Sequence, residues 1–130
     1  IPSIAFSIDS SNPKSFDTSK FIIRQIINLA IENGINKNFI WNVNIPNCEI
    51  DQLRGIKVAS QGNQYFNDDF DTRVDPKGKE YYWMVGNMVD EDSTFDSDSY
   101  VVKNDYASLS PLRFILSSSK EIEEMKKILD

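Results

Sequence analysis

Hydrophobic positions in the first half of the sequence follow a strand, helix, strand order. Short apolar runs at 2–8 and 39–45 are typical of buried strands. Between them, apolar residues over 17–33 cover a broad face, which predicts a helix that packs on a sheet. Asp17 or Ser15 is expected to cap its start, and Gly34 to stop it. This order predicts a βαβ crossover in a parallel sheet, followed by a further strand over 55–60.

The next segment predicts a long hairpin. Asp75-Pro76-Lys77-Gly78 has the residues of a type I turn. Because side chains alternate along a strand, Tyr81 and Trp83 lie on one face and Tyr82 on the other. Aromatic residues on both faces of a two-stranded ribbon need a partner surface, either the rest of this chain or a second copy of it.

The last third of the chain opens with an acidic stretch, 90–98. It is followed by a predicted helical turn over 99–105, a strand over 107–116 and a closing helix with a narrow apolar stripe. We therefore divide the chain into three parts. These are a βαβ unit plus strand (1–60), an extended hairpin (61–89), and a segment with the acidic loop, closing strand and C-terminal helix (90–130).

Composition excludes several kinds of chemistry. The 130 residues contain no histidine, which excludes His-based acid–base catalysis, Ser-His-Asp triads and His-ligated zinc within this chain. A metal bound here would be a hard cation on oxygen ligands. The net charge of −6 argues against a long nucleic acid or an anionic membrane as partner.

Cysteine usage and hydropathy indicate a cytoplasmic protein. Cys48 is the single cysteine, so no internal disulfide forms, and a reducing compartment is expected. We find no apolar run of the roughly 20 residues that a membrane span needs, and no signal-peptide pattern. The first apolar run starts at Ile1 without a polar lead-in, so we expect the chain to continue upstream.

Polar residues at strand ends are the candidates for the rim of a site. Ser7 and Asp9 lie at the carboxyl end of the first predicted strand, where open α/β sheets bind ligands. Asn42 and Asn44 leave the next strand on one face, and they either line a pocket or satisfy neighbouring loop backbone. Asp98 leads from the acidic stretch into a structured segment.

Two other groups have competing interpretations. The acidic stretch lacks the glycine and the final glutamate of an EF-hand, so we interpret it as solvated, with a metal-binding loop as the alternative. Arg73 and Asp75 flank the hairpin tip, where they either pair with each other or Arg73 meets a substrate or a neighbouring subunit. The Tyr81-Tyr82-Trp83 cluster either stacks a base or forms part of a hairpin core or interface.

Five motifs in order resemble one known family. They are IPSIAFS, WNVNIPN, GIKVASQGNQYF, RVDPKGKEYYW and SDSYVVKNDYASLSPL. Together they resemble the C-terminal half of the SurE (survival protein E) 5′/3′-nucleotidases over nearly all 130 residues. Two positions depart from that pattern: Trp41 replaces a common leucine, and Asn104-Asp105 replaces the glycine expected before Tyr106.

The resemblance implies an α/β fold, namely the C-terminal part of a Rossmann-like SurE sheet with a projecting hairpin and a C-terminal helix. It implies a phosphomonoesterase that hydrolyses nucleoside 5′- and 3′-monophosphates with a divalent metal such as Mg²⁺ or Mn²⁺. It also implies homodimers or tetramers that exchange the hairpin or the helix, which would place Arg73, Asp75, Tyr81, Tyr82 and Trp83 at an interface.

The family's metal-binding Asn-Asp-Asp-Gly turn has no counterpart in this sequence. We therefore assign no catalytic, cofactor-binding or metal-binding residue to this chain, and we expect the metal ligands upstream and the 130 residues alone to be inactive. The alternative is a non-catalytic self-association domain that keeps the hairpin and helix. A stand-alone carboxylate metalloenzyme using 90–98 is a third hypothesis.

Overall fold

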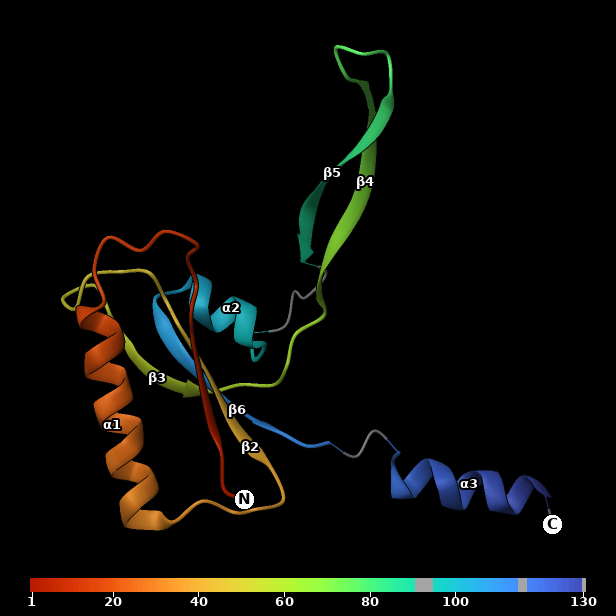
Figure 1. Cartoon of the computed structure of the whole chain (residues 1–130). Coiled ribbons are helices and arrows are strands. Elements are labelled where there is room, and N and C mark those ends of the chain that lie inside the picture. Colours follow the sequence, from red (N-terminus) through yellow and green to blue (C-terminus); the bar gives the residue numbers. More distant parts are fainter. Residues whose placement is uncertain (91–94, 115–116, 130) are drawn as a thin grey trace.

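The computed structural model describes residues 1–90, 95–114 and 117–129, and it shows a mixed α/β body from which a hairpin and a terminal helix project (Figure 1). The elements are β1 (Ile4–Ile8), α1 (Asp17–Asn33), β2 (Ile40–Ile45), β3 (Gly55–Val58), β4 (Gln64–Val74), β5 (Glu80–Asp90), α2 (Asp98–Lys103), β6 (Tyr106–Leu112) and α3 (Ser119–Leu129).

The central sheet has the strand order β1-β2-β6-β3. β1 pairs with β2 in parallel, which confirms the predicted βαβ unit. β6 runs antiparallel to β2 and parallel to β3. The sheet is therefore mixed, because the last strand of the chain inserts between β2 and β3.

Helix α1 covers one face of this sheet. Ile22 and Ile26 are fully buried against Val43, Ile45 and Ala107, which form the hydrophobic core.

The ends of α1 were predicted with mixed success. Gly34 ends the helix with a φ of 72°, as predicted. The predicted cap by Asp17 or Ser15 is wrong: Phe16 is the N-cap residue and makes no side-chain cap bond. The hydroxyl of Ser15 instead accepts from the Asp17 N–H at 3.1 Å and donates to the Asp17 carboxylate at 2.9 Å.

The opposite face of the sheet is polar. Asn42 lies opposite Ser110 and Asn44 opposite Ser108 in the β2–β6 ladder, so all four side chains share one face. Ser108 and Ser110 are buried, and the described part of the chain gives their hydroxyls no hydrogen-bond partner. This face, away from the α1 core, is where the polar candidates gather.

The hairpin β4–β5 pairs continuously from Gln64↔Asp90 to Val74↔Glu80. The predicted turn is confirmed, since the Gly78 N–H donates to the Asp75 carbonyl at 3.0 Å. Gly78 has a φ of 83°, which glycine adopts without the steric cost that other residues would meet.

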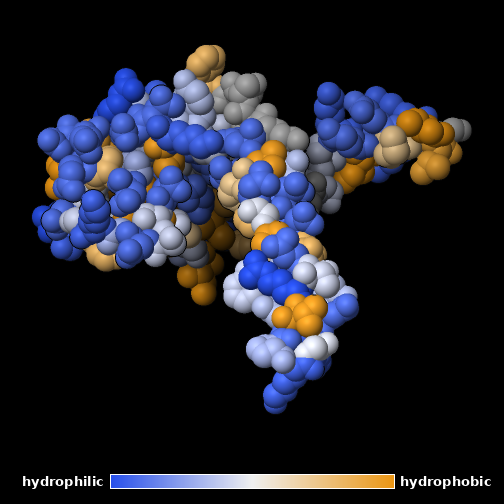
Figure 2. Space-filling view, turned by 90° about the horizontal axis from the view of Figure 1, so that it is seen from above, coloured by the Kyte–Doolittle hydropathy of each residue, from blue (hydrophilic) through white to orange (hydrophobic). Residues whose placement is uncertain are grey.

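The aromatic side chains of the hairpin are exposed, to 41% for Tyr81, 66% for Tyr82 and 56% for Trp83. Figure 2 shows hydrophobic residues on the surface of both projecting arms. Of the two predicted partner surfaces, the chain's own body therefore does not cover these rings.

The predicted pairing of Arg73 with Asp75 is wrong. Arg73 pairs instead with Asp71 at 3.2 Å, and its guanidinium lies 5.5 Å from the ring of Trp83. One oxygen of the Asp75 carboxylate accepts from the N–H groups of Lys77 and Lys79, both at 2.8 Å. The Asp75 carboxylate, which was expected to pair with Arg73, is therefore hydrogen-bonded to the backbone of its own turn.

Helix α3 confirms the predicted closing helix. Its apolar residues are exposed in this chain: Ile122, Met125, Ile128 and Leu129. Among the described residues, no helix combines the length and the apolar character that crossing a membrane requires.

Candidate functional site

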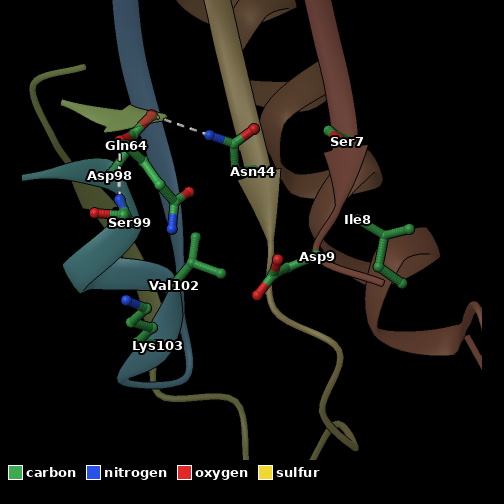
Figure 3. A pocket seen from close by; sticks show the side chains of 9 residues that line it. All are labelled: Ser7, Ile8, Asp9, Asn44, Gln64, Asp98, Ser99, Val102 and Lys103. Carbon is green, nitrogen blue, oxygen red and sulfur yellow. Dashed lines mark hydrogen bonds between the residues drawn. The ribbon is translucent and has the colours of Figure 1, made fainter. Parts of the chain in front are cut away.

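A polar pocket of about 260 Å³ lies between the carboxyl ends of β1 and β2 and the helix α2 (Figure 3). Its lining combines carboxylates, amides, hydroxyls and one ammonium group with two aliphatic side chains. The lining residues are Ser7, Ile8, Asp9, Asn44, Gln64, Asp98, Ser99, Val102 and Lys103.

The parallel pairing of β1 and β2 explains why candidates far apart in sequence meet here. Ser7 is the register partner of Asn44, and the Asp9 N–H continues the ladder to the Ile45 carbonyl at 2.9 Å. The carboxyl ends of parallel strands coincide at one edge, which is where open α/β sheets bind ligands. The structure thus brings together four of the five predicted rim residues: Ser7, Asp9, Asn44 and Asp98.

Asn42, the fifth rim candidate, shares the face of Asn44 but does not line the pocket. Asn44 itself both lines the pocket and donates its side-chain N–H to the Asp98 carboxylate at 3.2 Å. Its partner is therefore a side chain from α2, not the loop backbone that was one of the two alternatives.

Asp98 is the most connected side chain of the pocket. One carboxylate oxygen accepts from the Gly62 N–H at 2.9 Å and from the Ser99 N–H at 2.8 Å. The other accepts from Asn44, as the dashed line in Figure 3 shows. The carboxylate therefore joins β2, α2 and the segment that leads into the hairpin.

Sequence reasoning missed three polar lining residues: Gln64, Ser99 and Lys103. Ser99 and Lys103 stand four positions apart, and this spacing places two side chains on one face of a helix, so the predicted helical turn contained that signal. Gln64 gave no such signal in the sequence. It is the first residue of β4, and it reaches the pocket only through the tertiary path of the hairpin.

Opposite charges meet in and beside this pocket. Lys103 forms an ion pair with Asp90, at the end of β5. Asp9 and Asp98 add carboxylates, while hydroxyl and amide groups add hydrogen-bond donors. Such a lining suits a small polar ligand that offers both donors and acceptors.

These residues do not by themselves form a metal centre. Within 1–90, 95–114 and 117–129, no three groups of the Asp, Glu, Cys or His type converge on one point. The Asp98 carboxylate already accepts hydrogen bonds from three N–H donors. Of the acidic loop 90–98, the alternative metal site, residues 91–94 lie outside the described residues.

Cys48 is not a pocket residue, and it is poorly suited to act as a nucleophile. Burial raises the pKa of its thiol, and the negative charges of Asp105 and Glu49 raise it further. The reactive thiolate is therefore disfavoured at neutral pH.

The hairpin candidates form a second, separate group. Tyr81, Tyr82 and Trp83 pair with Arg73, Thr72 and Asp71 of β4, near the turn at Asp75, in the hairpin that projects from the body in Figure 1. The structure does not bring them to the pocket, so stacking of a ligand bound there is not supported.

An open α/β sheet with a polar pocket at the carboxyl ends of parallel strands defines a class of ligand-binding proteins. Comparison with known proteins narrows that class. The family model described as "Survival protein SurE" matches residues 1–68. The chain belongs to the SurE family, which confirms the family predicted from its motifs.

Similar curated proteins include the 5′-nucleotidase SurE of Christiangramia forsetii, 34% identical over 96% of this chain and 48% of the relative. The 5′-nucleotidase SurE of Petrotoga mobilis is 35% identical over 99% of this chain and 51% of the relative. The crystal structure of the SurE protein from Aquifex aeolicus matches with a TM-score of 0.76 and 31% identity, covering all of this chain and 52% of that one. The predicted α/β fold is thereby confirmed, and the chain spans about half the length of the curated relatives it matches.

Proposed function

We propose that these 130 residues are the C-terminal part of a nucleotidase that hydrolyses nucleoside 5′- and 3′-monophosphates. The observation that carries the proposal is the polar pocket at the carboxyl ends of β1 and β2, in a chain similar to proteins named 5′-nucleotidases. In this proposal the residues 1–60 and 90–130, together with Gln64 at the start of β4, build the wall of the site, and the rest of 61–89 serves assembly.

The size of the pocket supports a site that is shared with another part of the protein. Its volume of about 260 Å³ falls below the ~300–1,000 Å³ of sites that enclose a drug-sized ligand. We propose that residues outside this chain supply the opposite wall and the ligands of a divalent cation. The part played by this chain is then to orient the substrate.

Three side chains are suited to that part. The Ser7 hydroxyl and the Gln64 amide offer donors to phosphate or sugar oxygens, and Asp9 offers an acceptor to a ribose hydroxyl. Asn44 is held in place by Asp98 across the pocket wall.

We further propose that the protein is cytoplasmic and assembles as a homodimer or tetramer through its hairpin. The exposed aromatic rings of β5 support this, since a surface of this kind rarely remains open to water. The same observation favours the second candidate function, a self-association domain without catalytic activity.

Phosphate release separates the two candidates. We expect the full-length protein, that is, this chain together with the residues proposed to lie outside it, to release phosphate from adenosine 5′- and 3′-monophosphate with Mg²⁺ or Mn²⁺. Asp9→Asn should lower kcat/KM by about tenfold, because a neutral amide oxygen is a weaker acceptor for the ribose hydroxyl than a carboxylate. The matched control is Asp96→Asn, an exposed carboxylate that does not line the pocket.

No release by the full-length protein would favour the self-association domain. Release unaffected by Asp9→Asn would keep the enzyme but contradict the pocket as its substrate site.

A further inference from the structure

The segment that leads into β4 is hydrogen-bonded to the start of α2. Between β3 and β4, the Ser60 N–H donates to the Asp96 carbonyl at 2.8 Å, and the Asp98 N–H donates to the Ser60 carbonyl at 2.9 Å. Two residues further on, the Gly62 N–H donates to the Asp98 side chain at 2.9 Å. The chain is therefore held at two successive points before β4 begins.

The end of β5 contacts the same helix. β5 ends at Asp90, whose carboxylate pairs with Lys103 and lies 3.5 Å from the Ser99 hydroxyl. The carboxylate of Asp90 is largely shielded, at 17% exposure. Helix α2 therefore contacts the chain on both sides of the hairpin base, before β4 and at the end of β5.

Helix α2 is in turn anchored to the body. Val101 and Val102 are buried, and the Asp98 carboxylate accepts from Asn44 of β2. β4, by contrast, is exposed along its whole length. Apolar packing along that strand thus does not set the direction in which the ribbon leaves the body.

Asp98 is not needed as the cap of its own helix. Ser97 is the N-cap residue, and its hydroxyl accepts from the Tyr100 N–H at 3.3 Å. The Asp98 carboxylate is therefore free to reach Gly62 and Asn44, which stand 36 and 54 positions away in sequence.

From these contacts we infer that Asp98 is a positioning residue that fixes the base of the hairpin β4–β5 against the sheet. One side chain then sets both the direction of the projecting ribbon and one wall of the pocket. The inference concerns the geometry of this chain, so it holds whether or not the proposed nucleotidase activity is found.

The distance between the hairpin tip and the body tests the inference directly. Spin labels on cysteines introduced at Lys77, in the turn, and at Glu32, on α1, report that distance by pulsed electron paramagnetic resonance. The measurement uses full-length protein with its other cysteines replaced by serine, diluted in unlabelled protein so that pairs within one chain dominate.

We expect a narrow distance distribution in the unsubstituted protein and a distribution at least about twice as wide in Asp98→Ala, which loses all three acceptor contacts. Asp98→Asn keeps an oxygen for Gly62 and should restore most of the narrow distribution. Asp96→Ala removes a carboxylate two positions away that does not bond Gly62, Ser99 or Asn44. This variant should match the unsubstituted protein. An unchanged distribution in folded Asp98→Ala would overturn the inference.

Hydrogen exchange provides a second test if Asp98→Ala fails to fold. In the unsubstituted protein, the Gly62 N–H should show a protection factor at least about tenfold above that of Gln61, since bonded amides exchange only on opening. Equal protection at the two neighbours would contradict the Asp98–Gly62 bond and the positioning role with it.

Discussion

Single carboxylates organise whole segments of this chain. Asp75 closes the hairpin turn by accepting from two backbone N–H groups, and Asp98 does the same at the root of the hairpin. A carboxylate oxygen accepts more than one hydrogen bond, so one such residue replaces several weaker contacts. The two ends of the ribbon are therefore set by two aspartates.

The residue before β6 carries backbone strain. Asp105 has a φ of 62°, in the left-handed region, and its carbonyl accepts from the Arg54 N–H at 2.9 Å. The family resemblance led us to expect a glycine before Tyr106, which occupies this conformation without a steric cost. The structure thus explains that departure as a tolerated but strained substitution.

Replacing Asp105 by glycine should therefore stabilise the protein by about 0.5–1 kcal/mol, because relief of the left-handed strain exceeds the added chain entropy. Thermal unfolding of the full-length protein followed by circular dichroism measures the change. Asp105→Ala is the control, since alanine keeps the strain and should not raise the midpoint. A lower midpoint for Asp105→Gly than for the unsubstituted protein would show that the strain is not the governing term.

Predictability at this scale depends on how far away the partner lies. The turn at Asp75 was predicted from sequence because its acceptor contacts reach residues two and four positions on. The contacts of Asp98 reach across 36 and 54 positions. Only its location beside the pocket edge was predicted, and not its partners.

The two faces of the hairpin differ in chemistry. The register places Phe70 opposite Met84 on one face, with Phe66 opposite Met88. The other face carries Trp83 opposite Asp71, beside the Arg73 ion pair. Each face is thus available to a second copy. The first carries Phe66, Phe70, Met84 and Met88 together with Asp68 and Glu80, and the second carries Trp83 with the Asp71–Arg73 ion pair.

If the hairpin forms the proposed interface, Trp83→Ala should weaken self-association by about 2 kcal/mol, or roughly 30-fold in dissociation constant, as truncation of a buried tryptophan anchor does. Sedimentation velocity over a concentration series measures it. Phe21→Ala, an exposed aromatic on α1, serves as the control for general surface effects. Identical sedimentation of the Trp83→Ala and unsubstituted proteins would contradict the assignment of the hairpin to the interface.

Most elements were predictable because their signals are local. The periodicity of 17–33 and the alternation around 81–85 correspond to α1 and β5. The insertion of β6 between β2 and β3 was not predicted, since strand order is decided by which edges remain open after the crossover. The pocket residue Gln64 was missed because the tertiary path of the hairpin, and not a local pattern, brings it to the pocket.

At the scale of the whole molecule, the chain resembles one side of a larger site. Its sheet places a polar pocket at the strand ends, yet the described residues do not assemble a metal centre there. It matches about half the length of relatives named 5′-nucleotidases. In the proposed function, this chain contributes the pocket wall and the hairpin, and residues outside it bind the cation.

The most direct measurement of that account is metal-dependent release of phosphate from adenosine 5′-monophosphate by two polypeptides. One is the 130-residue chain alone, and the other is the longer protein that is proposed to contain it. We predict that the full-length protein releases phosphate with Mg²⁺ or Mn²⁺, and that the chain alone, shown to be folded by circular dichroism, releases none. Metal-dependent turnover by the 130 residues alone would contradict the account, because the cation would then be held by groups of this chain.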